Sequence, residues 1–179
     1  TVHDITAPSI SLAGPDITIE CPSLPVFTPP TGADECSQVT IVEVSDLTDG
    51  GICNYTRTKT WKAVDACGNE SGLVSQAITV HDITAPSIGA AGANATIDCP
   101  AEPEFTAPSV SDECSQVAII EVSDVTVRDS CGYTRTNTWK AIDFCGNESG
   151  LVSQAITVRD ITPPSIGAAG TNTIINCPS

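Results

Sequence analysis

The sequence predicts an all-β chain of tandem β-sandwiches, arranged like beads on a string and stapled by disulfides. It repeats with a period of 78 residues, as Asp4-Ile-Thr-Ala-Pro, Asp82-Ile-Thr-Ala-Pro and Asp160-Ile-Thr-Pro-Pro show. The strand-forming residues Val, Ile and Thr dominate, and Pro, Gly, Asn and Asp interrupt them at short intervals. Nine cysteines follow the same period, and small domains often use disulfides to supplement a thin core.

The period divides the chain into three segments. We expect a first repeat at 1–81, a second at 82–159, and the first strand region of a third at 160–179. No insertion disturbs the spacing at either join, which is typical of one folded unit copied head to tail. Because the chain begins and ends within a repeat, we expect it to be an excerpt of a longer array.

Each repeat is predicted to contain at least five antiparallel strands. The turn Asp49-Gly50-Gly51 favours a hairpin between the third and fourth of them. Strands with alternating faces in a unit of this size fit a small sandwich of the immunoglobulin type. In the first repeat the expected strands are 9–20, 26–28, 38–48, 55–65 (which contains Trp61) and 73–80.

The cysteines are expected to form one bridge at each end of a repeat. Tracing the strands up and down places Cys21 with Cys53 at one end, and Cys36 with Cys67 at the other. Four cysteines allow three connectivities, and sequence alone does not choose among them. The expected pairs are Cys21–Cys53, Cys36–Cys67, Cys99–Cys131 and Cys114–Cys145, with Cys177 left for a partner elsewhere in the third repeat.

The charge of the chain excludes several functions. A net charge of −15 with only seven Lys and Arg argues against binding nucleic acid or anionic membranes. No apolar run approaches the ~20 residues of a membrane-spanning helix. The acidic balance suits solubility and calcium binding, and the disulfides predict an extracellular location.

Carboxylates gather at the predicted junctions between repeats. Calcium prefers six to eight oxygen ligands, so converging aspartates would form a Ca²⁺ site. The alternative is that Asp simply favours turns. The candidates are Asp46, Asp82, Asp112 and Asp143 at the first join, and Asp4, Asp34, Asp65, Asp124 and Asp160 at equivalent positions, with Asn147 and Glu148 as secondary ligands.

No pattern in the chain indicates an enzyme. There is no nucleophile motif, phosphate-binding loop or Cys-x-x-Cys pair. His3 and His81 give way to Arg159 in the third copy, which argues against zinc. Potential glycan acceptors of the Asn-x-Ser/Thr pattern are Asn54, Asn69, Asn94 and Asn147.

The end of each repeat resembles a known family. Trp61-Lys-Ala-Val-Asp-Ala-Cys-Gly-Asn69, a final strand and the Asp82-Ile-Thr-Ala-Pro86 linker are similar to hyalin-repeat-like (HYR-like) domains of large Bacteroidota surface proteins. The resemblance covers both repeats. It implies an immunoglobulin-like fold, secretion to the cell surface, and a part in adhesion or extracellular fibres. A looser likeness to cadherin repeats, which bind calcium at acidic linkers, rests on the same turn and linker.

Two functions lead, and a third interpretation makes the repeats spacers beside a secreted hydrolase. The leading hypothesis is a structural repeat of a bacterial surface fibre or adhesin stalk, which associates with other copies of itself into filaments. The alternative is a multivalent adhesin module that binds a glycan or a host protein. Variable loops or an exposed aromatic cluster would favour the second.

Overall fold

The computed structural model describes residues 3–170, 172 and 174, and its regular elements there are β-strands. Within this part of the chain no helix is long and apolar enough to cross a membrane. The strands of the first repeat are β1 (Ser9–Ile10), β2 (Ile17–Glu20), β3 (Gly32–Ala33), β4 (Val39–Gly51), β5 (Asn54–Asp65) and β6 (Val74–His81). Those of the second are β7 (Ser87–Ile88), β8 (Ala95–Asp98), β9 (Val110–Ser111), β10 (Val117–Arg128), β11 (Gly132–Asp143) and β12 (Val152–Arg159).

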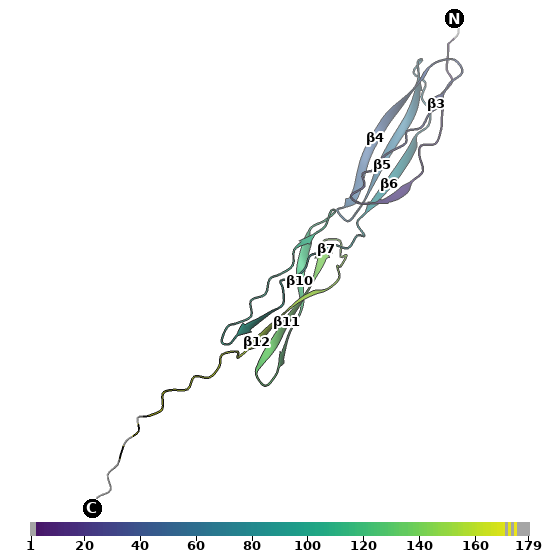
Figure 1. The fold of residues 1–179 in the computed structure, drawn as a ribbon. Helices are drawn as coiled ribbons and strands as arrows, with labels where there is room; N and C mark the ends of the chain where they lie inside the picture. The colour runs from purple at the N-terminus through teal and green to yellow at the C-terminus, as the bar shows by residue number, and fades with distance from the viewer. Residues whose placement is uncertain (1–2, 171, 173, 175–179) are drawn as a thin grey trace, which may run out of the picture.

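The two repeats form matching pairs of sheets. One four-stranded sheet has the order β2-β6-β5-β4 and the other β8-β12-β11-β10. A two-stranded layer, β1-β3 or β7-β9, accompanies each. The sheets follow one another along an elongated molecule (Figure 1). The predicted all-β, immunoglobulin-like sandwich is confirmed.

The core lies on one face of each large sheet. Along β5 and β6 alternate side chains are buried, as expected for strands with one covered face. Trp61 is 3% exposed and meets Phe27 edge to face, with 6.3 Å between the ring centroids. Trp139 and Phe105 repeat this contact at 6.2 Å. The tryptophans therefore pack the core and offer no exposed platform for a sugar.

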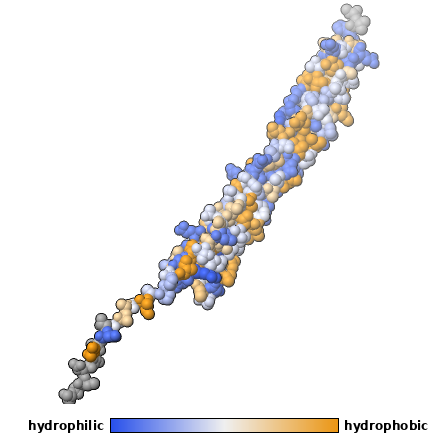
Figure 2. Space-filling model, viewed as in Figure 1, coloured by the Kyte–Doolittle hydropathy of each residue, from blue (hydrophilic) through white to orange (hydrophobic). Residues whose placement is uncertain are grey.

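Charged pairs lie on the same face of β5 as Trp61, because Arg57 and Lys59 alternate with it along the strand and both lie over the Phe27 ring. Arg57 on β5 pairs with Asp46 on β4, and Lys59 with Glu43. Such exposed pairs contribute little to stability. In the view of Figure 2, polar and apolar residues are interspersed along the length of the molecule.

Two predicted features of the sheet are wrong. β2 pairs with β6 in parallel, not antiparallel, because both strands run toward the same end of the repeat. Residues 26–28 form no strand. Prolines flank them, and proline has no N–H to donate to a ladder. Instead, Gln76 holds the segment: its Oε1 accepts the Thr28 N–H at 2.9 Å while its Nε2 donates to the Pro15 carbonyl at 2.9 Å.

Candidate functional site at the junction of the repeats

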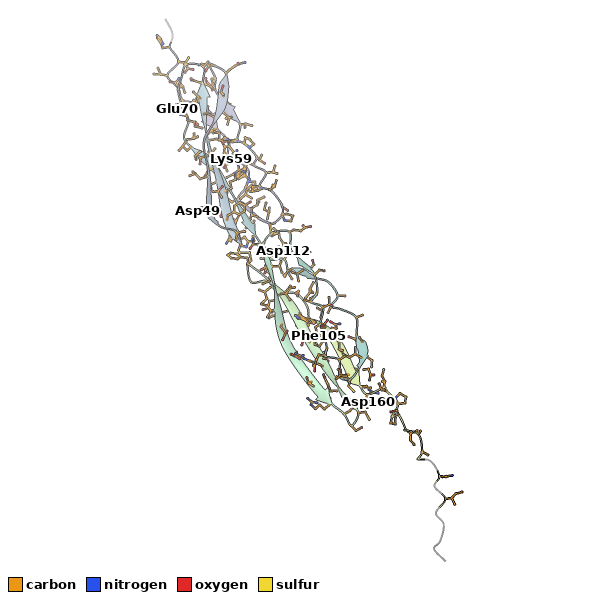
Figure 3. The ribbon with its side chains drawn as sticks, turned by 90° about the vertical axis from the view of Figure 1, so that its left-hand side faces the viewer. Asp49, Lys59, Glu70, Phe105, Asp112 and Asp160 are labelled. Atoms are coloured by element: carbon orange, nitrogen blue, oxygen red, sulfur yellow. A yellow bond between two sulfur atoms is a disulfide. The ribbon has the colours of Figure 1, made fainter. Side chains whose placement is uncertain are left out.

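The junction brings together four chain segments. The end of β2 and the β4–β5 hairpin loop come from the first repeat, and loops after β9 and β11 come from the second. The Cys21 N–H donates to the His81 carbonyl at 2.9 Å, and the Asp82 N–H donates to the Cys53 carbonyl at 3.0 Å. These bonds fix both cysteines beside the linker. Figure 3 places Asp112 where the first large sheet ends and the second begins.

Two disulfides cross this junction. Cys21 is bonded to Cys114, with 5.9 Å between Cα atoms, and Cys53 is bonded to Cys145, with 5.2 Å. Both Cα separations are ordinary for disulfides. Each bond therefore joins the lower end of the first repeat to the upper end of the second.

The predicted pairing within repeats is wrong. Strand tracing correctly placed Cys21 and Cys53 beside the same linker, but it assumed that the cysteines of a repeat pair only with one another. In the structure each of these cysteines reaches across the junction to the next repeat. The remaining four cysteines of the described chain, Cys36, Cys67, Cys99 and Cys131, are unpaired and exposed, and Cys177 lies outside the described residues.

Three carboxylates meet beside the disulfides. Asp82, Asp112 and Asp143 each place an oxygen within 4.8 Å of the others. Asp82 and Asp143 are only 6% and 5% exposed. All three belong to the second repeat, so the cluster is built by one repeat rather than shared between two.

Asp143 is held ionised by its own turn. Burial raises the pKa of this carboxyl, but hydrogen bonds from Asn147 and neighbouring amides outweigh burial and keep the pKa below its usual value. The Asn147 N–H and Nδ2 donate to the two carboxylate oxygens, each at 2.8 Å. This explains the Asp-x-x-Gly-Asn pattern of the turn without sugar attachment.

Asp112 shapes the loop that carries a bonded cysteine. Its Oδ1 accepts the N–H groups of Cys114 at 2.8 Å and Ser115 at 2.9 Å. A short Asp side chain that binds the backbone two and three residues ahead is typical of such turns. The carboxylate thus positions Cys114 for its bond to Cys21.

Asp82 differs, because one of its oxygens has no partner. Its Oδ2 is buried and accepts no hydrogen bond within the described structure. Asn147 Nδ2 lies 3.2 Å from the Asp82 carbonyl and 3.4 Å from its Oδ1. Leaving a buried carboxylate oxygen unpaired is costly. Hard oxygen donors in this arrangement fit Ca²⁺.

The same arrangement recurs at the upper end of the first repeat. Asp4 and Asp34 lie together beside Cys36. The Oδ2 of Asp4 is also buried without a partner. Asp65 is bound by Asn69 as Asp143 is by Asn147. At the lower end, Asp160 lies with Asp98 beside Cys99.

Asp46 and Asp124 do not join these clusters, and their predicted place at a junction is wrong. β4 continues to Gly51, so Asp46 lies within the strand and opposite Lys59. It binds Arg57 through Nε at 2.7 Å, and Asp124 binds Arg135 through Nε at 2.8 Å. Glu148, predicted as a secondary ligand, pairs with Lys140 at 2.7 Å.

The potential glycan acceptors have different surroundings. The side-chain nitrogens of Asn69 and Asn147 are engaged by aspartates. Asn94 is exposed and its Oδ1 accepts the Ala155 N–H at 2.7 Å. Asn54 is exposed at the start of β5. Sugar attachment at these positions stays a prediction.

An open groove of about 560 Å³ adjoins the Cys21–Cys114 bond. Its walls include Glu20, Pro22, Thr84 and Glu113. The Thr84 hydroxyl donates to the Glu20 carboxylate across the linker. The groove is polar and acidic in part.

Comparison with solved structures gives likenesses at low TM-scores. Drosophila N-cadherin EC1-4 is 10% identical, with 87% of this chain and 50% of that chain covered, at a TM-score of 0.39. The human Desmocollin-1 ectodomain is 10% identical, with 88% and 42% covered, at 0.31. The tandem Ig repeats of Dlar are 10% identical, with 86% and 99% covered, at 0.24.

The chain spans half the length of the first of these structures. No protein-family model matches the chain. No curated protein matches it either. At these TM-scores the likenesses identify neither a family nor a function, so the functional argument rests on the geometry of the junction.

Proposed function

We propose that this chain is a structural repeat of an extracellular fibre or adhesin stalk, in which covalent bonds between successive repeats produce a stiff rod. The two disulfides that join the first repeat to the second carry this proposal. Disulfides persist in oxidising compartments, which supports a location outside the cell. The HYR-like turn and linker, Trp61 to Pro86, support a place on a bacterial surface.

Stiffness follows from the number of attachments. A single peptide linker lets two domains swing about one point. Here the linker after β6 and the bonds at Cys114 and Cys145 attach the second repeat to the first at three places. Three separate attachments restrict bending and twisting together. Copies added on the same plan would extend the rod without adding a hinge.

Calcium binding at the carboxylate clusters is the second part of the proposal. Asp82, Asp112 and Asp143 would hold one ion, and Asp4 and Asp34 would hold a second, with Asp65 at the position that corresponds to Asp143. The cation would neutralise three neighbouring negative charges and supply a partner for the buried Oδ2 atoms of Asp82 and Asp4. Because Asp112 also positions Cys114, the ion would stiffen the loop that carries the disulfide.

Titration calorimetry with CaCl₂ tests the calcium sites. The wild-type chain is expected to bind two ions, and Asp82→Asn one. Asp46→Asn is the matched control, because Asp46 is ion-paired away from both clusters, and it should still bind two. Absence of calcium binding to the wild-type chain, or an equal loss in the control, would refute these sites.

One observation favours the alternative adhesin function. The groove beside Cys21–Cys114 has room for a small polar ligand such as a sugar. The walls of the groove contain no aromatic side chain, and Trp61 and Trp139 are only 3% and 5% exposed. A glycan array probed with the folded chain would test this function, and specific binding lost on Glu113→Lys would support it.

Small-angle X-ray scattering tests the rod directly. The oxidised chain should give the profile of one stiff, elongated particle. A variant with Cys21, Cys53, Cys114 and Cys145 all replaced by Ser should show a broader distribution of end-to-end distances, since only the linker would remain. Equal distributions for the two proteins would refute the stiffening role of the disulfides.

A further inference from the structure

The Asp82 carboxylate belongs to two groups of side chains at once. A carboxylate oxygen of Asp82 lies within 4.8 Å of oxygens of Asp112 and Asp143. A carboxylate oxygen of Asp82 also lies within 4.8 Å of both sulfur atoms of the Cys21–Cys114 disulfide. The side chain is buried in this position. The carboxylate cluster and the disulfide therefore share one buried residue.

Asp112 links the cluster to the same disulfide from the other side. Its Oδ1 accepts the N–H groups of Cys114 at 2.8 Å and Ser115 at 2.9 Å. The first repeat has the same link, since the Cys36 N–H donates to Asp34 Oδ1 at 2.8 Å although Cys36 is not bonded. The link is thus a property of the loop itself. Asp112 moves together with Cys114 whether or not the disulfide is closed.

The second disulfide is attached to the other two aspartates. The Asp82 N–H donates to the Cys53 carbonyl at 3.0 Å. Cys145, the partner of Cys53, lies in the turn that closes on Asp143, where the Asn147 N–H donates to the carboxylate at 2.8 Å. Each aspartate of the cluster is therefore attached to a segment that carries a bonded cysteine.

Closing the junction gathers negative charge at this place. When Cys114 approaches Cys21, Asp112 is carried toward Asp82, and the two carboxylates repel one another at a site partly shielded from water. A divalent cation between the carboxylates replaces this repulsion with attraction. Conversely, a closed disulfide holds the loop of Asp112 in place, so that ion binding does not have to order it. Both effects have the same sign.

We propose that calcium binding at Asp82, Asp112 and Asp143 and closure of the Cys21–Cys114 disulfide promote one another. The inference rests on the proposed calcium site and adds its regulation: the junction binds the ion more tightly when it is oxidised, and resists reduction more strongly when the ion is bound. The two effects are equal because both express one coupling free energy between two sites. A coupling of ordinary size changes each equilibrium about tenfold.

Opening of the disulfide is a two-electron reduction. Dithiothreitol attacks one sulfur atom, forms a mixed disulfide and then closes on itself. The protein gains two thiols, while the reagent loses two hydrogens and becomes a cyclic disulfide. The ratio of dithiothreitol to its cyclic disulfide at half reduction therefore measures how strongly the protein keeps the bond closed.

Titration calorimetry with CaCl₂ on variants of the full chain measures the effect of the bond on the ion. All variants carry Asp4→Asn, which removes the second proposed site and leaves one ion to be measured. Cys21→Ser/Cys114→Ser should raise the calcium Kd about tenfold. The matched control Cys99→Ser/Cys131→Ser removes two cysteines that belong to neither disulfide, and it should leave the Kd unchanged.

The effect of the ion on the bond is measured with all cysteines present, so it does not depend on the folding of a serine variant. The Asp4→Asn chain is equilibrated with dithiothreitol and its cyclic disulfide, in CaCl₂ or in NaCl of equal ionic strength, and is then alkylated. Peptide mass spectrometry gives the fraction of Cys21–Cys114 that stays closed. Calcium should raise the ratio needed for half reduction about tenfold, and Asp82→Asn should abolish this shift.

The outcomes separate the coupling from the calcium site on which it rests. A weaker affinity without the bond, together with a calcium-dependent shift in the half-reduction ratio, supports the coupling. A ratio that calcium leaves unchanged would overturn the coupling whatever the serine variant shows, and would leave the calcium site intact if the oxidised chain binds the ion. An oxidised chain that binds no calcium would refute the site itself and the coupling with it.

Discussion

Removing one bond across the junction gives the sharpest test of the disulfide pairing. Cys53 and Cys145 are 92 residues apart, and closing a loop of that length in the unfolded chain is worth about 4.6 kcal/mol in the chain-entropy treatment. With Cys21–Cys114 intact, the loop that closes is shorter, roughly 65 residues, and the figure falls to about 4.3 kcal/mol. Measured values usually lie at about 2–4 kcal/mol.

We therefore expect the double substitution Cys53→Ser/Cys145→Ser to lower the free energy of unfolding by about 2–4 kcal/mol. Urea denaturation followed by tryptophan fluorescence measures this loss, because each repeat buries one tryptophan. The matched control is Cys36→Ser/Cys67→Ser, which removes two unpaired thiols and should change stability by less than about 0.5 kcal/mol. Bridges within repeats would instead make the control destabilising by about 2–4 kcal/mol, and that result would refute our reasoning.

Three further changes have defined outcomes. Arg57 lowers the pKa of Asp46 to about 2, so this pair stabilises the fold above about pH 4, and the stabilisation is lost as pH falls through about 2. In acid titrations, Asp46→Asn should lack this pH-dependent part of the free energy of unfolding. Gln154→Leu strands two backbone groups and should cost about 2–4 kcal/mol in urea denaturation. Gly50→Ala, at φ 115° and with the added Cβ against the Asn54 carbonyl oxygen, should lower the melting temperature, whereas Gly51→Ala, in open space, should not.

The strands could be predicted from the sequence because burial of one face produces an alternating pattern of apolar and polar residues. The fourth strand was expected at 55–65 and β5 runs Asn54–Asp65, with every second residue buried toward its end. The parallel pairing of β2 with β6 could not be predicted from this pattern. Alternation records which face of a strand is buried, but not which neighbour the strand accepts as a partner.

The cysteine pairing was missed for a different reason. In a repeated sequence Cys114 and Cys36 have the same surroundings, so spacing cannot say whether Cys21 bonds within its repeat or with the next one. In the structure Cys21 bonds to Cys114 of the next repeat, not to Cys36 of its own repeat.

The carboxylate site was partly predictable. Asp82, Asp112 and Asp143 were expected together from turn positions, and the structure brings them within 4.8 Å. Asp46 was misplaced because its strand is longer than expected and the register sets it opposite Lys59. Strand length near a hairpin depends on pairing energies along the whole ladder, which a local pattern does not contain.

The junction also changes how a long chain of this kind fails. Its linker is open to attack, since Ile83 is 66% exposed, and exposed linkers are preferred sites of proteolysis. A protease that cuts there severs the peptide backbone, yet Cys21–Cys114 and Cys53–Cys145 still tie the fragments together. A reductant alone opens the bonds but leaves the backbone whole. Separating the two repeats therefore requires both cleavage of the linker and reduction of the two disulfides at the same junction.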